Sequence, residues 1–239
     1  MNWHRLVSTQ YFYTLAGKLL PISASVTFLC FGLGLWGGLW LAPADYQQGD
    51  AFRIIYLHVP CAAFSLLVYA IMAFLSLIYL IWKIKLADIL AKVSAPIGAS
   101  FTLLALITGS LWGKPMWGTW WIWDARLTSE LILLFLYLGI IALRSAMEDF
   151  SIAAKTVAML TLIGAIDVPI IHYSVNWWNT LHQPASLLQL AKPTIAMNML
   201  WPLLIMLVAL GGYYLTVLLL SARNEILRRE IATRWVSEL

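Results

Sequence analysis

The stretch IIYLHVPCAAFSLLVYAIMAFLSLIYLIW, residues 54–82, contains no Asp, Glu, Lys or Arg. A helix needs about 20 predominantly apolar residues to cross the roughly 30 Å hydrocarbon core of a bilayer. The stretch therefore predicts a membrane-spanning helix that is long enough to tilt, or to protrude as a helix beyond the membrane.

The whole chain has the composition of a bilayer protein. Of its 239 residues, 62% are hydrophobic and 11% are charged, and the mean hydropathy is +0.83; soluble domains are about 45–50% apolar and about 25% charged. Six apolar runs are long enough to span: residues 20–42, 54–82, 93–111, 127–143, 152–173 and 195–221. The predicted fold class is all-α, a polytopic membrane protein with six transmembrane helices forming a single membrane domain over residues 1–239.

The Lys and Arg residues predict the orientation, because cytoplasmic loops carry an excess of both. Of the 15, eleven fall on one side of the predicted bundle: Arg5, Lys18, Lys83, Lys85, Lys92, Arg144, Lys155, Arg223, Arg228, Arg229 and Arg234. The other side has four: Arg53, Lys114, Arg126 and Lys192. Both termini are therefore expected in the cytoplasm.

The first nineteen residues lack the pattern of a removable signal, so we expect the first span to be an uncleaved anchor. The cations lie between apolar runs rather than in one patch, so we expect no nucleic-acid partner.

A tryptophan-rich segment, WGKPMWGTWWIWDARLT at residues 112–128, is expected to form a loop on the outward, periplasmic side. Indoles are common at the headgroup level of a membrane, and that interpretation suits Trp40, Trp82, Trp112 and Trp201. It does not suit a cluster of four rings within seven positions: Trp117, Trp120, Trp121 and Trp123. Rings on all sides of one segment indicate burial against protein or coverage of a flat ligand.

Two histidines fall on the same side as these rings. His58 lies about one turn into the second span, before Pro60, whose missing N–H disturbs the helix, and an ionisable group at that depth indicates a functional site. His182 lies in the third outward loop, in NWWNTLHQP. A flat macrocycle with a central metal would use two imidazoles as axial ligands. Haem fits this pattern, with Arg53 or Arg126 facing its carboxylates. His4 is expected to be solvated and His172 to be structural.

The segment WGTWWIWDARLTSELIL resembles the signature of the tryptophan-rich WWD superfamily of haem-handling membrane proteins. Six spans, the HVP motif and NWWNTLHQP resemble one family within it, CcmC of the bacterial cytochrome c maturation system. The resemblance implies that His58 and His182 are axial ligands of the haem iron beside a haem platform formed by Trp117, Trp120, Trp121, Trp123 and Asp124.

The same resemblance implies a non-enzymatic role in the bacterial inner membrane. The protein would bind haem b non-covalently and transiently at the periplasmic surface and present it to the haem chaperone CcmE for covalent loading. Implied partners are the CcmA/CcmB ABC transporter and the small membrane protein CcmD. No CxxCH motif is present, which fits non-covalent haem. Two alternatives stay open: an electron-transfer subunit that keeps haem b within the bilayer, and a haem permease.

Several residues carry weaker expectations. Asp167 precedes Pro169 in the fifth span, and we expect it to hydrogen-bond the backbone freed by the proline. Asp124 and Glu130 are expected to cap the fourth span. Gly34 and Gly38 have the spacing of closely packed helices. Cys30 and Cys61 lie in apolar runs, form no CxxC pair and are expected to be buried thiols rather than a redox relay or a metal site.

Overall fold

The computed structural model describes residues 7–183 and 195–238, and these form long helices joined by short links. In chain order the elements are α2 (Thr9–Trp36), the π-helix η1 (Gly37–Leu41), the 3-10 helix η2 (Asp50–Ile54), α3 (Ile55–Trp82), α4 (Lys85–Trp117), α5 (Ala125–Ala146), α6 (Phe150–Gly164), α7 (Asp167–Trp177), α8 (Met197–Glu230) and α9 (Arg234–Ser237). Six helical segments are long and apolar enough to cross a membrane. The predicted all-α, six-span architecture is confirmed.

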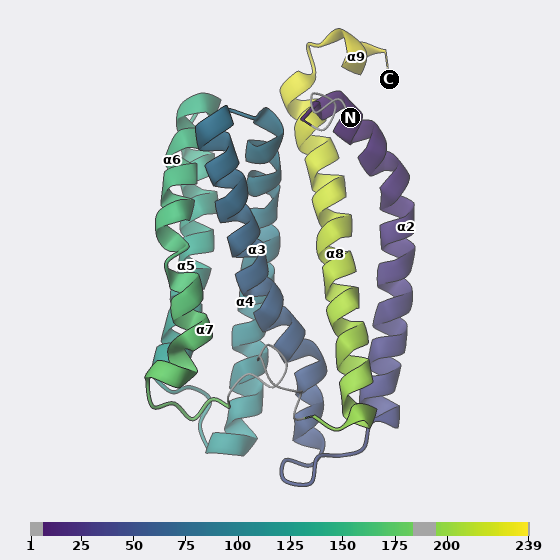
Figure 1. The fold of residues 1–239 in the computed structure, drawn as a ribbon, viewed down its shortest axis with the longest axis vertical. Coiled ribbons are helices and arrows are strands. Elements are labelled where there is room, and N and C mark those ends of the chain that lie inside the picture. The colour runs from purple at the N-terminus through teal and green to yellow at the C-terminus, as the bar shows by residue number, and fades with distance from the viewer. Residues whose placement is uncertain (1–6, 184–194, 239) are drawn as a thin grey trace.

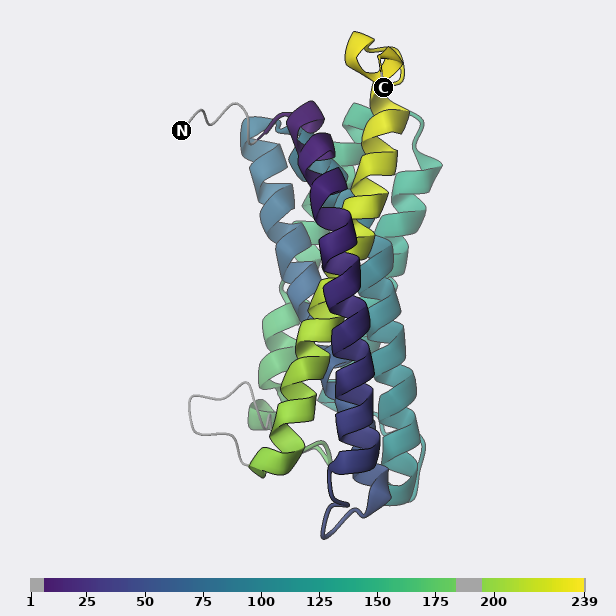
Figure 2. The same cartoon turned by 90° about the vertical axis from the view of Figure 1, so that its right-hand side faces the viewer.

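The helices run side by side in one bundle. Helix α2 packs along α8, α3 packs along α4, and α5 packs against α4, α6 and α7 (Figures 1 and 2). The start of α2 and the end of α8 lie at the same end of the bundle, which we call the terminal end (Figure 1). The link from α4 to α5 and the segment after α7 lie at the other end, which we call the opposite end.

Several helices continue beyond the apolar runs that predicted them. Helix α4 has 33 residues, which corresponds to about 50 Å at 1.5 Å per residue and exceeds the roughly 30 Å hydrocarbon core. It begins at Lys85 and ends at Trp117, where Gly118 adopts a positive φ of 76°. The tryptophan-rich segment is therefore the last turns of α4, a link over residues 118–124 and the first turn of α5, instead of one long loop.

The fifth span is broken into two helices. Helix α6 ends at Gly164 and α7 begins at Asp167. Pro169 lacks the N–H that would bond to the carbonyl of Ala165, so a continuous helix is disfavoured at that point. One carboxylate oxygen of Asp167 is buried and has no hydrogen-bond partner among the described residues. The predicted bond from Asp167 to the freed backbone is therefore not found in this part of the chain.

Small residues at the end of the first span allow close packing. An ideal Cβ on Gly38 would overlap the ring of Tyr56 on α3, and one on Gly34 would lie 2.7 Å from the sulfur of Met206 on α8. These two glycines thus allow close helix contacts, although their spacing alone assigned no site. Cys30 and Cys61 are both free thiols; Cys61 is buried, as predicted, whereas Cys30 is only half-buried.

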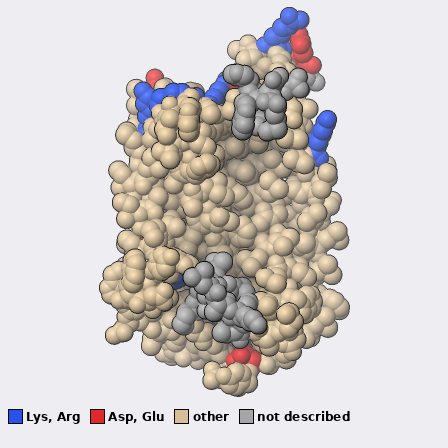
Figure 3. Space-filling model, viewed as in Figure 1, with Lys and Arg blue, Asp and Glu red and all other residues tan. Residues whose placement is uncertain are grey.

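A buried network of charges joins three helices near the terminal end. Asp88 of α4 accepts two hydrogen bonds from Arg144 of α5, both of 2.8 Å, and one of 2.7 Å from Arg229 of α8. Glu225 accepts from Arg229 and from Lys92. On the face seen in Figure 3, Lys and Arg gather at this end, and the middle of the bundle is uncharged. The network fixes how α4, α5 and α8 meet.

Replacing Asp88 by Ala tests this network. The change leaves the buried Arg144 without its carboxylate, and breaking a buried ion pair costs on the order of 3 kcal/mol. We expect a clearly lower unfolding temperature of the detergent-solubilised protein. The matched control is Glu238→Ala, because the Glu238–Arg234 pair is exposed and an exposed pair contributes little. Equal unfolding temperatures of the two variants would contradict the assigned role.

Candidate functional site

His58 is held by α4 through one nitrogen of its ring. Its Nδ1 lies 3.1 Å from the carbonyl oxygen of Ala105 and 3.0 Å from Oγ1 of Thr108. A carbonyl oxygen only accepts hydrogen bonds, so the proton is on Nδ1. The Thr108 hydroxyl donates to the carbonyl of Leu104 at 2.6 Å, and its oxygen is thus free to accept. The lone pair of the imidazole is consequently on Nε2.

His182 has the same tautomer although it lies outside the helices. Its Nδ1 lies 2.8 Å from the carbonyl oxygen of Gln183, which again places the proton on Nδ1. Burial lowers the pKa of the His182 imidazole below its ordinary value, and the nearby Arg126 charge lowers it further. The ring is therefore neutral at pH 7, with the lone pair on Nε2.

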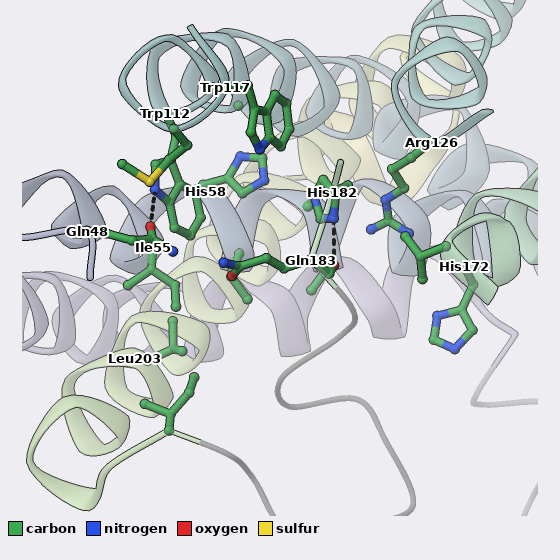
Figure 4. A pocket seen from close by; sticks show the side chains of 18 of the residues that line it. Gln48, Ile55, His58, Trp112, Trp117, Arg126, His172, His182, Gln183 and Leu203 are labelled. Atoms are coloured by element: carbon green, nitrogen blue, oxygen red, sulfur yellow. Dashed lines mark hydrogen bonds between the residues drawn. The ribbon is translucent and has the colours of Figure 1, made fainter. Parts of the chain in front are cut away.

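The two imidazoles lie close together. Their ring centres are 6.3 Å apart, and the ring planes are inclined by 41°. Both line one cavity at the opposite end of the bundle (Figure 4). The empty space of this cavity, its open mouth included, is about 1180 Å³. Its walls are largely apolar: Ile55, Ala62, Leu66, Met116, Val175 and Leu203. Helix α3 continues through Pro60, and His58 faces the cavity from this helix.

A smaller hollow of about 440 Å³ adjoins the first. It shares His58, His182, Arg126 and Trp117 with the large cavity, and Trp121 and Glu130 also line it. Glu130 is buried and accepts a 2.7 Å hydrogen bond from Ser65 of α3. Glu130 therefore joins α5 to α3 instead of capping α5, contrary to the prediction.

The tryptophans of the segment divide into two sets. Trp117 and Trp121 line the cavities, and the ring centre of Trp117 is 6.4 Å from that of His182. Trp120 and Trp123 lie on the surface with exposed fractions of 54% and 76%. The structure thus brings two of the four predicted platform rings to the histidines.

Trp112 also belongs to the cavity. Its ring lies edge-on to His58, with centres 5.7 Å apart, and its Nε1 donates to Gln48 at 2.8 Å. Trp112 therefore lines the cavity beside His58, which differs from the membrane-interface role that the sequence predicts for it.

The two predicted cations differ in their surroundings. Arg126 lines both cavities and donates a 2.6 Å hydrogen bond to the carbonyl of Ile171 on α7, and Figure 4 shows it close to His182. Arg53 donates to the carbonyls of Gly38 and Ala42 and pairs with Asp50. Arg53 is therefore directed to the end of the first span, whereas Arg126 is available to the cavity.

Comparison with known proteins identifies the family. A sequence profile of the family described as heme exporter protein C, CcmC, matches residues 2–237. The protein named heme exporter protein C in Haemophilus influenzae is 50% identical to this chain, over 95% of this chain and 92% of the relative. The protein of the same name in Escherichia coli K12 is 47% identical, over 99% of this chain and 95% of the relative. The relative from Bradyrhizobium diazoefficiens is 51% identical over 92% of this chain and 83% of its own.

The chain belongs to the CcmC family. Membership gives it a role in haem handling for cytochrome c maturation, as a multi-pass membrane protein. The CcmC family is a haem exporter family rather than a known family of enzymes. Among the described residues, no group of three or more His, Cys, Asp and Glu side chains could hold a bare metal ion. The two imidazoles of this chain, His58 and His182, suit an iron that is already coordinated by a macrocycle, as in haem.

Sequence reasoning missed several cavity residues. Gln48 and Gln183 both line the cavity. Gln48 lies in a link without a pattern, and Gln183 lies within NWWNTLHQP, where the sequence singled out only the histidine. His172 was expected to be structural, and the structure places it at the cavity, edge-on to Tyr173. The carbonyl of Ala105 could not have been found from sequence, because a backbone acceptor has no residue signature.

Gly109 of α4 leaves room for the His58 ring. An ideal Cβ at this position would lie 3.0 Å from Cε1 of His58 and 4.0 Å from Nε2. We expect Gly109→Ala to displace the ring by a few tenths of an ångström and to weaken haem retention several-fold, measured by haem titration of purified protein. Gly139→Ala is the matched control, since no atom lies within 4 Å of an added Cβ there. Unchanged haem retention in Gly109→Ala would contradict a close contact between His58 and haem.

Proposed function

We propose that this protein binds haem b non-covalently and transiently between His58 and His182 at the periplasmic membrane surface, and presents it to the chaperone CcmE for covalent loading. The observation that carries the proposal is the convergence of two neutral imidazoles, from α3 and from the segment after α7, at 6.3 Å.

This separation fits one iron between two rings. Imidazoles that bind a metal ion from opposite sides have ring centres about 6 Å apart, because each metal–nitrogen bond is about 2 Å and the nitrogen lies about 1 Å from the ring centre. Rings in van der Waals contact would be closer, and rings in unrelated positions would be farther apart. The 6.3 Å separation of the ring centres therefore supports one iron held between the two rings.

The hydrogen bonds of both rings support ligation. A metal-bound histidine usually donates its second ring N–H to a carbonyl or carboxylate, which fixes the tautomer and the ring orientation. Here the carbonyls of Ala105 and Gln183 serve as the acceptors. Both Nε2 lone pairs are thereby left outside these hydrogen bonds and would be available to a metal.

The walls suit a porphyrin. Ligand cavities are typically lined by apolar and aromatic groups with few polar ones, as this cavity is. Trp117 and Trp121 would cover the macrocycle, and Arg126 would meet a propionate carboxylate. Trp120, Trp123 and Asp124 complete the proposed platform at its edge, and Arg53 stays a secondary candidate for a propionate. Bound haem would supply the iron held by the imidazoles and the vinyl edge that the chaperone receives.

The proposed setting follows from the charges. The cation-rich terminal end would face the cytoplasm of a bacterium, with both termini there, and the cavity would face the periplasm. The single membrane domain would bind and release haem without catalysing a reaction. CcmE would accept the haem, and the CcmA/CcmB ABC transporter and CcmD would assemble with this chain.

The histidines provide the first test. We expect His58→Ala and His182→Ala each to remove the bis-histidine absorption spectrum of the purified haem-bound protein and to lower its haem content at least tenfold. His172→Ala is the control, because His172 lines the same cavity without being a proposed ligand, and its spectrum should match that of the unchanged protein. Bis-histidine spectra retained in both ligand variants would refute the assignment.

A topology reporter provides the second test. We expect an enzyme that is active only in the periplasm to be active when it is inserted within residues 118–124. The same enzyme inserted within residues 147–149, between α5 and α6 at the terminal end, should be inactive. The reverse pattern would place the cavity in the cytoplasm and exclude loading of a periplasmic chaperone.

A further inference from the structure

The carboxylate of Asp124 joins two parts of the proposed haem site. Asp124 is the N-cap of α5, and its Oδ1 accepts a 2.8 Å hydrogen bond from the backbone N–H of Leu127. Its Oδ2 accepts a hydrogen bond from the hydroxyl of Thr180, 56 residues farther along the chain. One side chain therefore ends the tryptophan-rich link and also reaches the segment after α7.

Thr180 passes this connection on to His182. Its Oγ1 accepts a 3.0 Å hydrogen bond from the backbone N–H of His182 while its hydroxyl proton is donated to Asp124. A hydroxyl has one donor and two acceptor positions, so both bonds form at once. The order of the contacts is the start of α5, Asp124, Thr180 and the backbone of His182.

The connection matters because the segment at residues 178–183 is not helical. The Nδ1 bond of His182 goes to the adjacent residue, Gln183, and so fixes the ring only relative to its own segment. Fixing a backbone residue costs roughly 1–2 kcal/mol of conformational entropy. A tertiary hydrogen bond is therefore needed to place the ring relative to α3 and His58.

A second capping aspartate shows that Asp124 does more than cap. Asp149, the N-cap of α6, accepts from the backbone N–H groups of Ser151 and Ile152, both through Oδ1. These bonds stay within its own helix. Asp124 uses one oxygen for its helix and the other for Thr180.

We infer that Asp124 and Thr180 are positioning residues that hold His182 at the distance from His58 required by one iron. The inference rests on the proposed function, and it adds to the place of Asp124 at the edge of the platform a role that acts through His182. Outer hydrogen-bond partners of metal ligands typically change metal affinity by about 10–100-fold.

The test compares three variants of Thr180 and His182 in the full-length, haem-loaded protein. Thr180→Val keeps the shape and removes the hydroxyl, and we expect about tenfold weaker haem binding with partial loss of the bis-histidine spectrum. Free imidazole should restore that spectrum by occupying the position that His182 leaves. Thr180→Ser keeps the hydroxyl and should retain both affinity and spectrum. His182→Ala should lose the spectrum and recover it with free imidazole.

Asp124→Asn and its combination with Thr180→Val test the shared connection. Both variants interrupt the same chain of bonds, so the double variant should bind haem no more weakly than the weaker single variant. Asp149→Asn, the cap control, should leave the spectrum unchanged. A purely structural role would lower the unfolding temperature of Thr180→Val and leave the spectrum intact.

The outcomes separate the two proposals. An intact spectrum and affinity in Thr180→Val, with loss in His182→Ala, would overturn the positioning role and leave the ligand assignment standing. An intact spectrum in His182→Ala would overturn the ligand assignment and the positioning role with it. Loss in both, with rescue by Thr180→Ser, is the expected result.

Discussion

In the hydrocarbon core of a bilayer no water is available to satisfy backbone N–H and C=O groups. This constraint accounts for the helical spans, of which only the fifth is divided, between α6 and α7, and it places longer non-helical links where helices emerge. A site that combines helix and link residues must therefore lie near one end of the bundle. His58 on the second turn of the second span and His182 on the segment after α7 meet where both kinds of backbone are allowed.

The two ends of the bundle differ in what fixes them. Near the terminal end, Asp88 binds Arg144 and Arg229 and so ties α4, α5 and α8 together. At the opposite end, single hydrogen bonds tie neighbouring elements, such as Arg126 to α7 and Asp124 to Thr180. A buried ionic network favours one arrangement of helices more than it adds stability. Ion pairs fix the helices near the terminal end, whereas single hydrogen bonds join the elements around the cavity. This difference suits a protein that takes up a large ligand and releases it again.

Hydropathy was enough to predict all six spans, because a membrane-spanning helix needs about 20 predominantly apolar residues and such runs are visible in the sequence. Pairing His58 with His182 followed from topology alone. The division of the tryptophans did not, because it depends on where α4 ends: with Trp117 still helical, Trp112 and Trp117 face the cavity. The binding of Arg53 to the carbonyls of Gly38 and Ala42 also escaped prediction, since backbone acceptors leave no pattern in a sequence.

The most direct measurement is an experimental structure of the haem-loaded protein in a lipid nanodisc, with the iron located by its anomalous scattering or its density. We expect the iron within about 2 Å of Nε2 of both His58 and His182, with the porphyrin covered by Trp117 and Trp121. An iron bound by only one of these imidazoles, or seated elsewhere in the bundle, would contradict the account.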